Sequence, residues 1–219
     1  MQAIDTPFLL LFFRAVARRL EENREALCGL DGEIGDGDHG TSMANGFAAV
    51  VSTLRDIDAA KEPPSAVLRK ASVAFLSDVG ATVGPLYASA LLQASRAFDD
   101  RPDLSLSELS TFILALADGI AVRGKAQAGD KTMLDAWLAA AHAARAQEAL
   151  GARPGHVALK AAEAAEAEAR ATATMIASRG RAALLKERSL GHQDPGAVSA
   201  AIILRTLSDV VSDLAEQAP

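Results

Sequence analysis

The sequence has little of what cross-links, strands or nucleic-acid surfaces require. Cys28 is the only cysteine, so the chain forms neither an internal disulfide nor a thiolate metal cluster. Aromatic residues make up only 4% of the chain, and Ala and Leu fill most apolar positions, which favours closely packed helices over a β-sandwich. The formal charge of −6 and the lack of a basic stripe argue against nucleic acid as a partner.

Long apolar runs are also missing. The apolar segment 7–13 is too short to span a membrane. No basic stretch precedes it and no cleavage site follows it, so it is not a signal peptide. The sequence therefore predicts a cytoplasmic protein without a membrane span. Half of its residues are hydrophobic, which is enough for a sizeable core in one domain.

Glycine- and proline-bearing segments divide the chain into helical stretches. Periodicity and end signals predict helices over about 6–28, 41–60, 65–78, 84–98, 107–123, 132–151, 156–177 and 196–216. No strand signal of useful length and no linker interrupts them. We therefore predict an all-α fold, an antiparallel bundle of eight helices in a single domain.

The segment 29–40, GLDGEIGDGDHG, alternates acidic residues with glycines. Its acids are Asp31, Glu33, Asp36 and Asp38. The glycines predict an irregular loop in which the carboxylates converge, and Mg²⁺ takes oxygen ligands in such an arrangement. The alternative is a solvated acidic loop. An EF-hand calcium loop fits poorly, because Gly40 and an apolar helix follow where that motif continues.

Two glycine-bearing helix starts, at 40–41 and 80–84, are suited to phosphate because their N–H groups are free. Loop arginines such as Arg181 offer the positive charge that phosphoryl transfer needs. The segment 119–125 imitates a P-loop but fails, because Ala126 stands at the hydroxyl position and no strand precedes it.

Four separated segments resemble the L subunit (DhaL type) of dihydroxyacetone kinases. They are IGDGDHGTSMANGF (34–47), VGATVGPLY (79–87), RGKAQAGDKTMLDAW (123–137) and SRGRAALLKERSLGHQDPGA (178–197). The resemblance covers essentially the whole chain and implies one nucleotide-binding domain over residues 1–219. It also implies an eight-helix antiparallel up-and-down barrel with Mg²⁺-bound adenine nucleotide at one end.

The resemblance assigns roles to individual residues. Two Mg²⁺ ions would link the phosphates of ADP or ATP to Asp31, Asp36 and Asp38, and Arg181 would approach the phosphates and assist catalysis. The remaining nucleotide contacts would be His39, Gly40, Thr41 and Ser42 at the phosphates, Thr82 and Val83 along the nucleotide, Gly124 and Met133 at the adenine, and Asp194, Pro195 and Gly196 over base and ribose.

The sequence departs from that family at three places. Ser42 replaces an Asn, residues 80–83 replace Gly-Gly-Ala-Ser, and residues 182–186 replace Ala-Ser-Tyr-Leu-Gly in the loop expected to face a partner. Glu33 lies outside the implied metal set.

The resemblance implies a phosphotransferase of glycerol metabolism that is active only with a separate, ketose-binding K subunit. The phosphoryl donor would be Mg-ATP, or bound nucleotide recharged by a phosphotransferase-system protein, and the acceptor dihydroxyacetone or a tetrulose. An alternative is a non-catalytic Mg-nucleotide-binding module that regulates a partner protein. A third is a plain helical scaffold with a calcium-stabilised loop.

Overall fold

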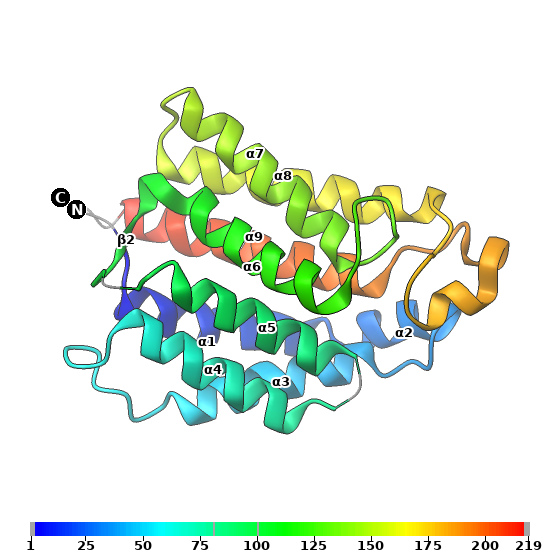
Figure 1. Cartoon of the computed structure of the whole chain (residues 1–219), viewed down its shortest axis with the longest axis horizontal. Coiled ribbons are helices and arrows are strands. Elements are labelled where there is room, and N and C mark those ends of the chain that lie inside the picture. Colours follow the sequence, from blue (N-terminus) through cyan, green and yellow to red (C-terminus); the bar gives the residue numbers. More distant parts are fainter. Residues whose placement is uncertain (1–2, 81, 100, 217–219) are drawn as a thin grey trace.

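The computed structural model describes residues 3–80, 82–99 and 101–216, which form nine α-helices (Figure 1). They are α1 (Thr6–Glu22), α2 (Arg24–Ile34), α3 (His39–Thr53), α4 (Pro64–Asp78), α5 (Val83–Arg96), α6 (Leu109–Gly124), α7 (Met133–Ala149), α8 (Pro154–Ala171) and α9 (Pro195–Glu216). Shorter elements are the strands β1 (Ala3–Ile4) and β2 (Leu104–Ser105) and the 3₁₀ helices η1 (Leu106–Glu108), η2 (Thr172–Thr174) and η3 (Arg181–Ser189).

Eight of these helices form a closed ring. In the order α1, α3, α4, α5, α6, α7, α8, α9, each packs against the next, and α9 closes the ring against α1. Neighbours run in opposite directions, as Figure 1 shows. α2 lies outside the ring at one end and contacts α3, α9 and η3. The predicted all-α, antiparallel up-and-down barrel is therefore confirmed.

The helix predicted over 6–28 is wrong at its end, because two helices occupy this stretch. α1 stops at Glu22, where the Asn23 side-chain amide donates a hydrogen bond to the carbonyl of Arg19 at 2.8 Å. Asn side chains that bond nearby backbone groups compete with helix continuation. Neither glycine nor proline marks the break, so the sequence pattern runs straight through it.

The irregular loop predicted over 29–40 is also wrong over its first half. α2 continues through two glycines to Ile34 and ends at Gly35, whose N–H donates to the carbonyl of Asp31. The loop that remains is only 35–38. Packing against α3 and α9 holds residues helical that glycine alone would disfavour.

The largest buried side chains fill the middle of the ring. Trp137, Tyr87 and Phe75 are fully buried. The ring of Phe47 meets those of Phe75 and Tyr87 edge-on, with centroids 5.2 and 5.9 Å apart. None of the described helices is both long and apolar enough to cross a membrane.

Two short strands, absent from the prediction, join the start of the chain to the connection before α6. Ala3 pairs with Ser105 and Ile4 with Leu104, antiparallel. Two-residue strands are too short to leave a period in the sequence. They lie at the end of the barrel away from α2 (Figure 1).

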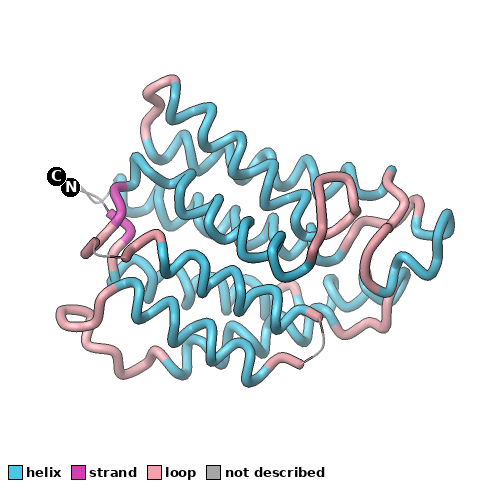
Figure 2. Tube along the Cα trace, viewed as in Figure 1, coloured by secondary structure: helices cyan, strands magenta, loops and turns pink. Residues whose placement is uncertain are grey.

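The up-and-down order brings four helix starts to the same end of the barrel. α3, α5, α7 and α9 begin there, next to α2 and η3 (Figure 1). Figure 2 shows the loops that precede them gathered at this end, on the right of the view. The first N–H groups of a helix have no partner within it and carry partial positive charge. The topology thus surrounds one opening with four anion-attracting helix ends.

Candidate functional site

A cavity of about 420 Å³ opens among these four helix starts. It is lined by every predicted site residue except Gly40 and Thr41, namely Asp31, Asp36, Asp38, His39, Ser42, Thr82, Val83, Gly124, Met133, Arg181, Asp194, Pro195 and Gly196. These residues come from segments far apart in the sequence, and the fold brings them together.

Gly40 and Thr41 face α2 instead of the cavity. A Cβ at Gly40 would lie 2.0 Å from the carbonyl oxygen of Arg24, so only glycine allows α3 to start this close to α2. The hydroxyl of Thr41 lies 3.6 Å from the sulfur of Cys28. Any contact of these two residues with a bound anion would use the backbone N–H groups, and their assigned roles stay predictions.

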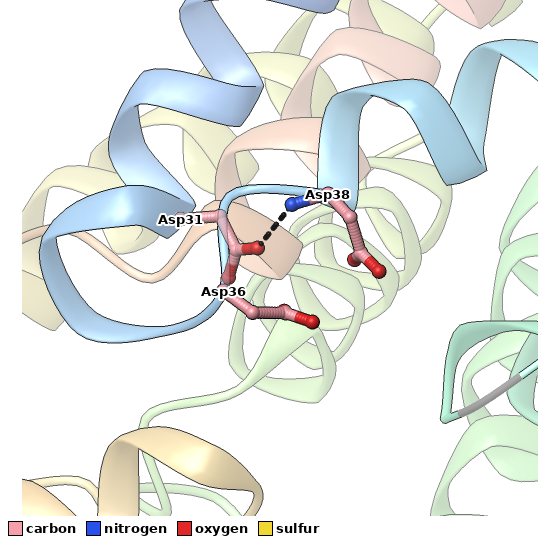
Figure 3. Close-up of side chains that lie close together, drawn as sticks. All are labelled: Asp31, Asp36 and Asp38. Atoms are coloured by element: carbon pink, nitrogen blue, oxygen red, sulfur yellow. Dashed lines mark hydrogen bonds between the residues drawn. The ribbon is translucent and has the colours of Figure 1, made fainter.

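The three aspartates converge at the mouth of the cavity. Asp31 projects from the last turn of α2, Asp36 lies in the 35–38 loop and Asp38 immediately precedes α3. Carboxylate oxygens of the three lie within 4.8 Å of one another (Figure 3). Asp31 is fixed, because its Oδ2 accepts the N–H groups of Asp38 at 3.0 Å and of His39 at 3.3 Å.

This cluster carries more negative charge than its neighbours balance. Desolvation raises the pKa of Asp38, and the charges of Asp36 and Asp31 raise it further. The one counter-charge paired with the cluster among the described residues is Arg181, whose guanidinium contacts Asp36. Glu33 lies apart and faces His192 at 3.7 Å. A converging set of carboxylates fits a hard divalent cation such as Mg²⁺.

His39 points inward and joins α3 to α9. Its Nε2 lies 2.9 Å from the hydroxyl of Ser199, which donates its own hydrogen to the carbonyl of Gly196 at 2.9 Å. The network therefore assigns the ring proton to Nε2. Burial lowers the pKa of His39 to about 4, so the imidazole is neutral near pH 7. Its side chain positions two helix starts and brings no positive charge to the cavity.

Asp194 caps the start of α9 inside the cavity. Its Oδ2 accepts the N–H of Ala197 at 2.7 Å, and its own N–H donates to the hydroxyl of Thr172 at 2.9 Å. Desolvation raises the pKa of Asp194 to about 7, the charge of Asp135 adds to this and Lys131 opposes it. Both the protonated and the ionised form of this carboxyl are therefore populated near pH 7.

The cavity has an apolar part as well as a charged part. Val83, Leu86, Ile120 and Met133 line it from α5, α6 and α7. A ligand with both a flat apolar portion and an anionic portion matches such a lining.

Three basic residues that line the cavity are not among the predicted site residues. They are Arg123, Lys131 and Arg179. Arg179 donates to Asp130 at 3.1 Å, and Lys131 is only 1% exposed. Lys131 lies within the 123–137 segment already singled out, but nothing in the local sequence reveals that a lysine beside Asp130 is buried.

Comparison with known proteins identifies the family. Residues 33–209 match the DAK2 domain, and the chain belongs to this family. It is 43% identical over 185 residues to the protein named PEP-dependent dihydroxyacetone kinase, ADP-binding subunit DhaL, of Escherichia coli K12, covering 84% of this chain and 87% of that protein. It is 37% identical over 194 residues to the PTS-dependent dihydroxyacetone kinase, ADP-binding subunit DhaL, of Lactococcus lactis, covering 89% and 92%.

A solved structure has the same fold. The dihydroxyacetone kinase from C. freundii in complex with AMP-PNP and Mg²⁺ superposes with a TM-score of 0.71 at 21% identity. The match covers 95% of this chain but 35% of that one, so this chain spans about a third of that kinase. At this identity the likeness concerns the fold.

Proposed function

We propose that this chain is the nucleotide-binding, phosphoryl-donor subunit of a kinase that acts on dihydroxyacetone or a similar short-chain keto-sugar. The observation that carries the proposal is the meeting, in one cavity, of a three-carboxylate cluster, four helix starts and an apolar wall. The two DhaL relatives are matched over most of their length and are named as ADP-binding subunits, which supports the same role here.

In this proposal Asp31, Asp36 and Asp38 hold Mg²⁺. We further propose two ions, since three carboxylates together with nucleotide phosphates carry more charge than one divalent cation balances. Bound Mg²⁺ supplies the charge neutralisation that phosphoryl transfer requires. Asp31 keeps its orientation through the N–H groups it already accepts at the start of α3.

The remaining cavity residues bind and orient the nucleotide ADP or ATP. The phosphates lie against Ser42, Arg181 and the N–H groups at the helix starts, where both side-chain and dipolar charge are favourable. The adenine lies against the apolar part that includes Val83 and Met133. Arg181 stabilises charge that develops on the transferred group.

The acceptor sugar is held elsewhere. We propose a separate K subunit that binds the ketose, in keeping with the subunit names of the relatives. Those names, PEP-dependent and PTS-dependent, also support recharging of resident ADP by a phosphotransferase-system protein over exchange of free ATP. We propose further that residues 1–219 act as one domain and work in the cytoplasm.

The test is calorimetric titration of ADP and ATP into the purified chain with and without Mg²⁺, after analysis for co-purified nucleotide. We expect Mg²⁺-dependent binding that is lost in Asp36→Ala. Glu33→Ala is the matched control, because Glu33 is an acid of the same segment that lies outside the cluster. If neither nucleotide binds at any Mg²⁺ concentration, the kinase proposal is wrong.

A second measurement separates catalysis from regulation. With the cognate K subunit and keto-sugar added, the chain loaded with Mg-ATP should transfer the γ-phosphoryl group to a hydroxyl of the sugar and be left with ADP. Binding without transfer would instead support the alternative, a regulatory module that senses Mg-nucleotide.

A further inference from the structure

Lys131 is a buried charge that the proposed phosphoryl transfer does not use. It is 1% exposed and lies between α6 and α7 with a left-handed backbone, φ 59°. Its Nζ donates toward backbone carbonyls of Thr172 at 2.8 Å, Met175 at 3.2 Å, Ser189 at 2.6 Å and His192 at 2.6 Å. An ammonium has three hydrogens, so these acceptors satisfy it fully and compensate its burial.

The four acceptors belong to the two ends of one excursion of the chain. Thr172 and Met175 follow α8, and Ser189 and His192 precede α9. The ammonium therefore ties the departure of the 172–192 segment to its return. It acts alongside two hydrogen bonds between the same ends, from the N–H of Gly191 to the carbonyl of Ala173 at 2.8 Å and from the N–H of Ala177 to the hydroxyl of Ser189 at 3.0 Å. Between these ends lies Arg181, which contacts Asp36 of the acidic cluster.

Asp130, the residue before Lys131, holds the same segment from outside. Its backbone carbonyl accepts the N–H of Ser178 at 3.2 Å, and its carboxylate accepts the Ser178 hydroxyl at 2.6 Å and Arg179 Nε at 3.1 Å. Asp135 steadies this loop in turn, accepting the N–H of Thr132 at 2.7 Å. Asp130 and Lys131 therefore make most of the polar contacts between the loop that precedes α7 and the 172–192 segment.

The segment buries little side-chain surface. Between residues 178 and 192 only Ser189 is buried, and Leu184 is 83% exposed. Gly180, Lys186 and Gly191 have positive φ values, so the backbone is left-handed on either side of the 3₁₀ helix η3 and at the kink within it. Apolar burial is therefore too small to fix the segment, and the polar anchors decide its position.

We propose that Asp130 and Lys131 form a clasp that holds the 172–192 segment over the cavity, with Lys131 as a positioning residue for Arg181. The clasp keeps Arg181 beside the aspartates and so sets how long a nucleotide stays bound. The statement about nucleotide rests on the proposed function, whereas the statement about the clasp does not.

Trypsin offers a direct readout, because the segment contains four of its sites, after Arg179, Arg181, Lys186 and Arg188. In Lys131→Met, cleavage at these sites should be faster than in the wild type by about tenfold or more, since their opening no longer breaks the ammonium contacts. The sites of cleavage are mapped by mass spectrometry, so that local opening is told from global unfolding.

Lys125→Met is the matched control. Lys125 lies in the same loop, also with positive φ (51°), but it is exposed. This variant should be cleaved in the segment at the wild-type rate. Asp130→Ala is a second test that stands if Lys131→Met fails to fold, and it should open the segment around Ser178. Segment cleavage at the wild-type rate in the folded variants would overturn the clasp.

The effect of the clasp on the nucleotide is tested by stopped-flow measurement of the rate at which a fluorescent ADP dissociates in the presence of Mg²⁺. Release should quicken in Lys131→Met, or in Asp130→Ala, and stay unchanged in Lys125→Met. An opened segment with unchanged release would refute the positioning role. If the wild type binds no ADP, the proposed function fails, while proteolysis still decides whether the clasp exists.

Discussion

The two charged loops that border the cavity, 35–38 and 129–132, differ in how their charges are satisfied. The three aspartates gathered around the first loop lie close together, and Arg181 is the one cation paired with them in the part of the chain that the structure describes. In the second, the buried Lys131 uses all of its donors on four carbonyls. Converging charges that the protein does not balance indicate a ligand-binding site. A buried charge whose hydrogen bonds are all made within the protein indicates a structural role.

The largest effect should come from the unbalanced loop. Asp38→Asn should reduce phosphoryl transfer by about 10²–10³-fold, because one electrostatic group that acts on the transition state is lost. Its free energy of unfolding should not fall, since repulsion by Asp36 and Asp31 is relieved. Steady-state kinetics with the K subunit and urea denaturation measure the two quantities. Parallel losses of activity and stability would contradict the comparison.

The satisfied loop should show the opposite pattern. Lys131→Met should lower the free energy of unfolding by about 3 kcal/mol, because buried carbonyls lose a charged partner. Urea denaturation gives the value. The exposed Lys125→Met should stay within about 0.5 kcal/mol of the wild type, and a similar loss there would mean that the loss in Lys131→Met does not come from burial of the ammonium.

Asp194 should make the free energy of unfolding depend on pH. Its folded pKa of about 7 lies above the usual 3.8, so the folded state binds the proton more strongly than the unfolded state. The stability it contributes is complete below about pH 4 and is lost as pH rises toward 7, at roughly 1.4 kcal/mol for each pH unit. Asp135 and Asp31 act in the same direction, and Lys131 opposes them.

The measurement is nucleotide-free urea denaturation of the wild type and Asp194→Asn across this pH range. The wild type should lose a few kcal/mol relative to the variant between about pH 4 and 7. Using the difference cancels the contribution of His39, whose depressed pKa makes stability rise with pH over part of the same range. A difference that does not change with pH would show that Asp194 is ionised throughout.

The smallest expected effects separate two glycines beside the acidic cluster. Gly40→Ala should cost about 1–3 kcal/mol, because the new Cβ would meet the carbonyl of Arg24. Gly29→Ala should instead stabilise by about 0.5–1 kcal/mol, since Gly29 is helical with open space around it. Thermal or urea denaturation distinguishes them. Equal effects would show that the two glycines are used in the same way.

Much of the fold could be predicted from the sequence, because the signals that start and end helices are local. Prolines at the first turn place the starts of α4, α8 and α9, and the Thr132 and Asp135 capping box fixes the start of α7. The break at Asn23 and the helical run through Gly29 were missed, since the first depends on one side-chain bond and the second on packing.

The candidate site likewise has some features that the sequence predicts and others that only the fold creates. The sequence by itself determined an all-helical chain, the acidic cluster and the four segments of the family, because spacing, capping and composition act between residues close along the chain. Only the tertiary structure decided that four helix starts share one cavity, that Gly40 and Thr41 turn away from it and that His39 is neutral. It alone placed Lys131 among carbonyls from 41 to 61 residues away. Burial, desolvation and long-range hydrogen bonds depend on which segments meet, and no local pattern encodes that.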